Sequence, residues 1–395
     1  MTRREAVHKF ALFLAGSPLL NAQPATEATG PDPSLEDVVN VFDLDAICKT
    51  KTTQAAYDYV SGGGWDEQTL RRNREMFKKV MLLPRHLRKV DELDLSMELF
   101  DLKLPMPICV APTGSHGMVH PEGELATARA AGAVDALMAV SSTSSYSIDQ
   151  ISAAAAAPLW FQLYVQQREQ ETRERVDNAL AAGCRAICWT VDGPYPGPRE
   201  RDVRNRNAYR SQRESADNRS GRRRSRSRGS NRPPSPYGVN ANPQSALDWN
   251  FLDKLKQWTS VPVLIKGVMT PEDALMAVER GADGIVVSNH GGRYMDAIPS
   301  TIEVLPEIVD VVGGRIIVVT DSGYRRGVDI LKALAIGAKA VFIGRPVLWG
   351  LGAFGEAGAK KALEILRKEP AWSMGQAGRK DIASIDRSLV KIDPA

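Results

Sequence analysis

A chain of 395 residues with 43% hydrophobic residues can bury the core of one large domain. Few aromatic residues, 32 glycines and only four cysteines argue against a fibrous or disulfide-stapled protein. The net charge of +4 is local: residues 199–232 hold 13 Lys or Arg and 4 Asp or Glu, which leaves 38 basic and 43 acidic residues elsewhere. We therefore expect no nucleic-acid partner.

The first segment, residues 1–35, is interpreted as a targeting signal and linker. Arg3 and Arg4 precede the apolar run Phe10–Leu14, and this order resembles a twin-arginine (Tat) export signal, which would place the protein in the periplasm. Otherwise the segment is an N-terminal extension and the protein is cytoplasmic. No stretch of the sequence is long and apolar enough to span a bilayer.

Residues 36–395 are expected to form a single domain that begins with a helical segment. Leu44, Ile47, Ala55, Ala56 and Tyr59 share one helical face before a run of glycines. Eight short apolar runs then follow: Ile108–Ala111, Leu137–Ser141, Leu159–Tyr164, Ala186–Val191, Val263–Lys266, Ile285–Ser288, Ile316–Thr320 and Val341–Ile343. Such runs are typical of parallel strands buried on both faces.

Helix patterns separate these runs, most clearly after the fifth. Thr270 is a capping residue, Pro271 suits the first helical position, and Gly281 ends the helix. Eight strands alternating with helices predict an α/β fold of the (β/α)8 TIM-barrel type. A doubly wound sheet is the alternative, which the count of eight disfavours.

The longest gap between runs follows the fourth strand and holds an Arg/Ser-rich insertion at about 203–244. Its centre, Arg222–Arg228 and Pro233–Pro236, has too little apolar area to offset the entropy of ordering, so a disordered, mobile insertion is expected. One interpretation is a lid or a tether to an anionic surface. The other is a solvated loop.

Polar or conformationally permissive residues stand at the end of every apolar run. Barrel enzymes place their chemistry at these C-terminal strand ends, so the pattern predicts an enzyme. After the sixth run come His290 and, three residues later, Arg293. A neutral imidazole can accept a proton and a guanidinium can grip a carboxylate with two hydrogen bonds. A structural histidine in a capped loop is the alternative.

Asp192 ends the fourth run and needs a partner if it is buried. We expect it to pair with His290, raise the pKa of the imidazole and orient its ring. The alternative is a cap of the following loop.

Residues 321–327 and 344–346 follow the last two strands, where barrels commonly bind phosphate. Lys266 would add a positive charge in the barrel mouth. No metal site is expected, because Cys184 and Cys188 are four residues apart and no histidine cluster accompanies them.

Several motifs together resemble the FMN-dependent L-2-hydroxy-acid oxidases and dehydrogenases, the family of glycolate oxidase, lactate oxidase and mandelate dehydrogenase. The motifs are Tyr57-Asp58-Tyr59, Ala111–Gly114, His120–Glu124, Phe161–Tyr164, Thr190–Asp192, Ser288–Arg293, Arg325–Gly327 and Phe342–Pro346. They run in order over residues 36–392, apart from the insertion.

The resemblance implies a role for each matching residue. His290 would be the base, Asp192 its charge partner and Tyr164 a contact of the reacting hydroxyl, while Tyr59, Arg199 and Arg293 would bind the substrate carboxylate. The FMN ring and its phosphate would be held by Pro112, Thr113, Gly114, Ser141, Gln162, Thr190, Lys266, Ser288, Asp321, Ser322, Gly323, Arg325, Gly344 and Arg345.

Three residues depart from the family pattern. Thr143 stands where glycolate oxidases carry Trp, Ser322 where the family usually has Gly, and Gly114 where Ala is common. The small Thr143 favours a lactate-like substrate over glycolate.

The resemblance also bears on partners and competing functions. It implies a homotetramer and an electron acceptor that is oxygen, a quinone or a cytochrome. Two other functions are kept open: another FMN barrel enzyme of the isomerase type, and a non-catalytic barrel whose basic loop binds anions.

Overall fold

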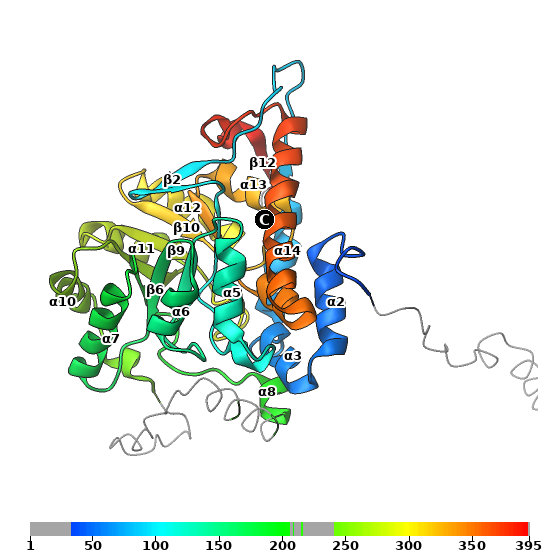
Figure 1. Ribbon diagram of the computed structural model, residues 1–395. Coiled ribbons are helices and arrows are strands. Elements are labelled where there is room, and N and C mark those ends of the chain that lie inside the picture. Colours follow the sequence, from blue (N-terminus) through cyan, green and yellow to red (C-terminus); the bar gives the residue numbers. More distant parts are fainter. Residues whose placement is uncertain (1–32, 206–207, 209–214, 216–240, 394–395) are drawn as a thin grey trace, which may run out of the picture. The chain divides into compact units, whose positions relative to one another are not determined.

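The computed structural model describes residues 33–205, 208, 215 and 241–393. Within them eight parallel strands form a closed barrel in the order β10-β11-β4-β5-β6-β7-β8-β9 (Figure 1). The strands are β4 (Ile108–Val110), β5 (Met138–Ser141), β6 (Leu159–Leu163), β7 (Ile187–Thr190), β8 (Val263–Val268), β9 (Gly284–Val287), β10 (Ile317–Thr320) and β11 (Ala340–Ile343). The predicted (β/α)8 barrel is confirmed, strand for strand, and a doubly wound sheet is excluded.

Helices connect successive strands and cover the outside of the barrel (Figure 1). They are α5 (Gly123–Gly132), α6 (Ile148–Ala154), α7 (Glu169–Ala181), α10 (Asn250–Trp258), α11 (Pro271–Glu279), α12 (Thr301–Val312), α13 (Gly327–Ile336) and α14 (Arg345–Ala377). The predicted caps of α11 are present, because Thr270 accepts a hydrogen bond from the Asp273 amide and Gly281 follows with a positive φ. None of the helices among the described residues is long and apolar enough to cross a membrane.

The N-terminal helical segment consists of separate helices rather than one. They are α2 (Val41–Lys51), α3 (Gln54–Ser61) and α4 (Gln68–Glu75). The chain turns between α2 and α3 because Thr52 is extended and the Thr53 hydroxyl caps the next helix at Ala56. The apolar face seen in the sequence therefore spans two helices, and α2 packs along α14 (Figure 1).

Short elements complete the structure around the barrel. The hairpin of β2 (Met97–Leu99) and β3 (Leu102–Leu104) packs Leu99, Leu102 and Leu104 into the same cluster as barrel-interior side chains such as Trp160 and Phe342. This cluster includes Leu137 and Ala186, which precede β5 and β7, so the hairpin closes the N-terminal end of the barrel. The opposite end is left for a binding site.

Other short elements are β1 (Val80–Leu82) paired with β12 (Val390–Ile392), α8 (Glu200–Arg204), and the 3-10 turns Met76–Lys79, His116–Met118, Pro243–Ala246, Ile382–Ser384 and Arg387–Leu389. The predicted insertion at 203–244 begins and ends inside two of them, because Val203 belongs to α8 and Gln244 to a 3-10 turn. The Arg/Ser-rich centre lies outside the described residues, as does most of the proposed targeting segment.

Candidate active site

A cavity of about 250 Å³ lies at the C-terminal ends of the barrel strands. Most of the predicted site residues line it: Tyr59, Pro112, Thr113, Gly114, Ser141, Tyr164, Arg199, Lys266, His290, Arg293, Asp321, Ser322, Gly323, Arg325, Gly344 and Arg345. Asp192, Gln162, Thr190 and Ser288 stand behind this lining. Ser288 bonds to Lys266, and Gln162 joins Ser141 to Thr190. The fold thus brings the whole predicted set together.

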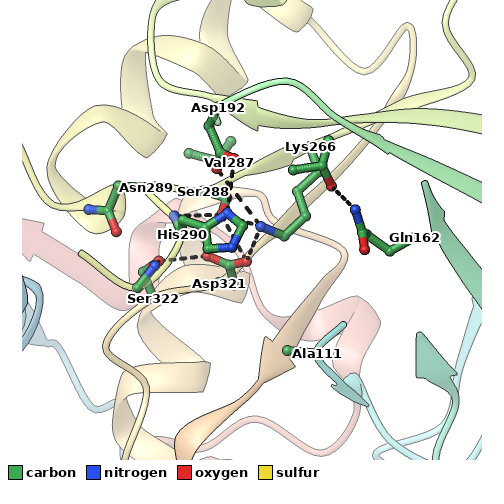
Figure 2. Close-up of polar contacts among 12 residues, drawn as sticks. Ala111, Gln162, Asp192, Lys266, Val287, Ser288, Asn289, His290, Asp321 and Ser322 are labelled. Carbon is green, nitrogen blue, oxygen red and sulfur yellow. Dashed lines mark hydrogen bonds and ion pairs between the residues drawn. The ribbon is translucent and has the colours of Figure 1, made fainter. Parts of the chain in front are cut away.

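The imidazole of His290 is held between two other strand ends. Its Nδ1 lies 2.9 Å from Asp192 Oδ1, just after β7. Its Nε2 lies 3.3 Å from the hydroxyl of Tyr164, just after β6. Because the carboxylate occupies Nδ1, Nε2 is the nitrogen left to exchange a proton within the cavity (Figure 2).

The electrostatics of the His290–Asp192 pair combine two opposing effects. Burial lowers the pKa of His290 below its ordinary value and outweighs the opposing effect of the Asp192 carboxylate; the nearby Lys266 lowers it further. Asp192 thus raises the pKa of His290 as expected, but burial has the larger effect because it penalises the imidazolium. Burial also opposes ionisation of Asp192, yet His290 and Lys266 hold the pKa of Asp192 below its usual range.

Lys266 is a buried cation that connects the two acidic residues of the site. Its side chain is 5% exposed, and Nζ donates to Ser288 Oγ at 2.9 Å and lies 3.5 Å from Asp321 Oδ2 and 4.0 Å from Asp192 Oδ2. Although burial opposes it, these carboxylates raise the pKa of Lys266, so it stays charged.

The register of β8 shifts just after Lys266. Gly267 there has φ +115°, and a Cβ at this position would come 2.7 Å from the Cβ of Asp192. A glycine is therefore needed where the backbone of β8 passes the side chain of Asp192.

Two guanidinium groups meet on one tyrosine at the cavity wall. Arg293 and Arg199 lie 4.9 Å and 5.5 Å from the ring centre of Tyr59. Arg293 donates to the carbonyl oxygens of Tyr59 and Gly62 at 2.6 Å and 3.2 Å, and among the described residues it forms no ion pair. Burial, then the charge of Arg199, lowers the pKa of Arg293. A bound carboxylate would relieve this excess of positive charge.

A second cationic group lies at the starts of α13 and α14. Arg325 stacks 4.6 Å from the ring centre of Trp349, and burial, together with the charge of Arg74, lowers its pKa to about 9. Arg345 donates to the carbonyl oxygens of Val60, Gly62 and Gly291. Buried guanidinium groups beside helix N-termini are suited to a phosphate.

Comparison with known proteins identifies the family to which these residues belong. The pattern of the FMN-dependent dehydrogenase family matches residues 48–392. The chain belongs to the FMN-dependent dehydrogenases. As a member of this family it is an FMN-dependent oxidoreductase, and the phosphate-suited cations at Arg325 and Arg345 fit that cofactor. The isomerase-type and non-catalytic alternatives are set aside.

Individual relatives of this FMN-dependent dehydrogenase cover nearly the whole chain. A peroxisomal (S)-2-hydroxyacid oxidase of Arabidopsis thaliana is 41% identical over 91% of the chain and 98% of the relative. Glycolate oxidase 1 of Oryza sativa subsp. japonica is 40% identical over 90% and 96%. The crystal structure of mandelate oxidase is 35% identical, with a TM-score of 0.79 over 91% of this chain and all of the other.

Tyr294 is a residue of the dehydrogenase site that was missed in the sequence. Tyr294 lines the cavity, and its ring meets that of His290 edge-on, with centres 4.5 Å apart. Burial raises the pKa of Tyr164, and both the charge of Tyr294 and a hydrogen bond to it add to this effect. The available signal was an aromatic residue directly after Arg293. No group of three or more His, Cys, Asp or Glu within the described ranges is placed to hold a metal ion.

Proposed function

We propose that this FMN-dependent dehydrogenase oxidises small (S)-2-hydroxy acids to 2-keto acids, with His290 as the catalytic base. The observation that carries the proposal is the juxtaposition of a base and an anion-binding group in one cavity. His290 is bonded to Asp192 at 2.9 Å, and Arg293 lines the same cavity. The first two relatives named above are (S)-2-hydroxyacid and glycolate oxidases, which supports this substrate class.

Each residue of the cavity has a distinct part in the proposed reaction. Arg293, Arg199 and Tyr59 bind the substrate carboxylate, and Tyr164 contacts the reacting hydroxyl. His290 Nε2 accepts a proton from the substrate, and the Asp192 carboxylate at Nδ1 stabilises the imidazolium that forms. Because burial lowers the pKa of His290, the base is neutral and ready at pH 7.

FMN, when bound, takes up the two electrons of the oxidation. The residues proposed to hold its ring are Pro112, Thr113, Gly114, Ser141, Gln162, Thr190, Lys266 and Ser288, and those proposed for its phosphate chain are Asp321, Ser322, Gly323, Arg325, Gly344 and Arg345. The charge of Lys266, buried and fixed by two carboxylates, is suited to an anionic ring.

We further propose that the preferred substrate is larger than glycolate. Thr143 lines the cavity beside Gly114, where any Cβ would collide with the Thr143 hydroxyl. The Thr143 and Ser141 hydroxyls lie 2.9 Å apart, which fixes this short side chain. A short side chain at position 143 leaves room beyond the substrate α-carbon, and each methylene in an apolar pocket gives about 10- to 200-fold discrimination.

The test is anaerobic bleaching of the flavin by glycolate, lactate, 2-hydroxybutyrate and mandelate. Lactate or a longer acid should give a higher kcat/KM than glycolate, and Thr143→Trp should reverse that order. If no 2-hydroxy acid reduces the flavin of the wild-type enzyme, the substrate class is wrong. If glycolate is preferred, only the size argument fails.

Three further properties are proposed with their own tests. Oxygen is the electron acceptor favoured by the oxidase relatives, and the rate of reoxidation by air, compared with quinones and cytochromes, decides between them. A homotetramer should appear in analytical ultracentrifugation. Export by the Tat route should be lost when Arg3 and Arg4 are replaced by Lys, as measured by cell fractionation.

A further inference from the structure

Ser322, in the loop after β10, has a backbone conformation that its side chain makes unfavourable. Its φ is +74°, in the left-handed region where a Cβ is disfavoured and glycine is at home. The residue is 8% exposed, so solvent contact offers no reason for a polar side chain. A serine in this position needs an explanation in what its hydroxyl does.

The hydroxyl of Ser322 joins two loops. It accepts a hydrogen bond from the backbone amide of Gly291 at 2.9 Å, and it donates to Asp321 Oδ1 at 2.6 Å. Since its proton is committed to Asp321, the hydroxyl is no donor for a phosphate. Its partner Gly291 directly follows His290, on the loop after β9.

The Asp321 side chain extends this chain of hydrogen bonds back to His290. Asp321 Oδ2 accepts from Ser288 Oγ at 2.9 Å, and Ser288 Oγ accepts from the backbone amide of His290 at 3.1 Å. A closed ring of hydrogen bonds therefore runs through Ser322, Asp321, Ser288 and the His290–Gly291 backbone. Figure 2 shows the side chains of Ser288, Asp321 and Ser322 beside His290. His290 itself has φ +57°, so its backbone also needs support from its surroundings.

We propose that Ser322 is a positioning residue for the catalytic base. Its hydroxyl fixes the amide that follows His290, while Ser288 fixes the amide of His290 itself. The two bonds keep the left-handed turn in which the imidazole reaches both Asp192 and the cavity. This inference rests on the proposed role of His290 as base.

Ser322→Gly removes the hydroxyl but keeps the positive φ of the backbone, so it tests the role of the hydroxyl alone. Ser322→Gly and Ser322→Ala lose the same hydrogen bonds, but glycine accepts a positive φ without strain, so the FMN-bound Ser322→Gly enzyme should melt at a higher temperature than Ser322→Ala. The affinity for FMN should be unchanged, because the Ser322 hydroxyl is committed to Asp321 and only the backbone of residue 322, which glycine keeps, is left to contact the phosphate chain. The affinity for substrate should also be unchanged, because Arg293 is held by other contacts. The limiting rate of anaerobic flavin reduction should fall about tenfold, the effect on a rate of losing one hydrogen bond.

Two further variants complete the experiment. Ser322→Ala should show the same loss of rate with a lower melting temperature, since it keeps the strain. Asp135→Gly is the matched control: Asp135 has φ +53° and is exposed, and it precedes β5 at the other end of the barrel. The flavin of Asp135→Gly should be reduced by substrate at the wild-type rate.

Two results would overturn the proposal. The first is a wild-type limiting rate in Ser322→Gly. The second is a loss confined to FMN affinity, with the wild-type rate restored at saturating FMN, since Ser322 would then serve the cofactor loop alone. Failure of the wild-type enzyme to be reduced by any 2-hydroxy acid would instead refute the proposed function.

Discussion

Replacing Asp192 by Asn would test whether its charge supports the base. The carboxylate lies 2.9 Å from His290 Nδ1, and the side chains of Asp192 and His290 are only 12% and 20% exposed. An amide keeps the shape but cannot stabilise the imidazolium that forms as the substrate loses its proton. A hydrogen bond to a charged group contributes about 1.5–3 kcal/mol. The limiting rate of flavin reduction should therefore fall about 10- to 150-fold.

Asp192→Asn should also shift the pH dependence of kcat/KM in a definite direction. The Asp192 charge raises the pKa of His290 against the larger effect of burial, so its removal should lower that pKa further. The acidic limb of the kcat/KM profile reports protonation of the base and should move to lower pH. Stopped-flow reduction and steady-state rates between pH 5 and pH 9 would measure both effects.

Asp310→Asn makes the same chemical change at a surface ion pair with Arg387 and serves as the control. Asp310→Asn should have the same limiting rate of flavin reduction and the same pH profile as the wild-type enzyme. A wild-type rate for Asp192→Asn, or an acidic limb that moves to higher pH, would show that the Asp192 charge does not support the base.

Three other substitutions address the base, the phosphate site and the residue missed in the sequence. His290→Gln should still bind FMN but lose about 10²- to 10⁴-fold in flavin reduction, and near-normal reduction would remove His290 from the mechanism. Arg325→Met should weaken FMN binding in a titration of apo-protein while riboflavin, which lacks the phosphate, binds as before; equal losses would argue against a phosphate contact. Tyr294→Ala should raise kcat/KM for mandelate relative to lactate, since it opens space beside His290; an unchanged ratio would show that Tyr294 does not limit substrate size.

The barrel was predictable because its strands are buried on both faces and its helices carry local capping signals. An uninterrupted apolar run such as Ile285–Ser288 can be satisfied only inside such a sheet, and Thr270 with Pro271 defines the start of a helix from a few neighbouring residues. The strand ends then fix which polar residues share the cavity, so the candidate site followed from the strands.

What the sequence did not reveal depends on contacts between distant residues. The net pKa shift of His290 is set by how deeply the barrel buries it, which outweighs a correctly expected partner. The value of the Ser322 hydroxyl appears only when the Gly291 amide and Asp321 are seen beside it. The turn between α2 and α3 was hidden because both helices present apolar residues to the same core.

The charges of the cavity explain why its arginines are so strongly perturbed. Arg293, Arg325 and Arg345 all have pKa values lowered first by burial and then by neighbouring guanidinium groups. Two carboxylates at the cavity, Asp192 and Asp321, already form ion pairs with Lys266. The remaining excess of buried positive charge is unfavourable in the protein alone. An anionic cofactor and an anionic substrate would neutralise this charge at the two ends of the cavity, so the same groups would be the source of its affinity and selectivity.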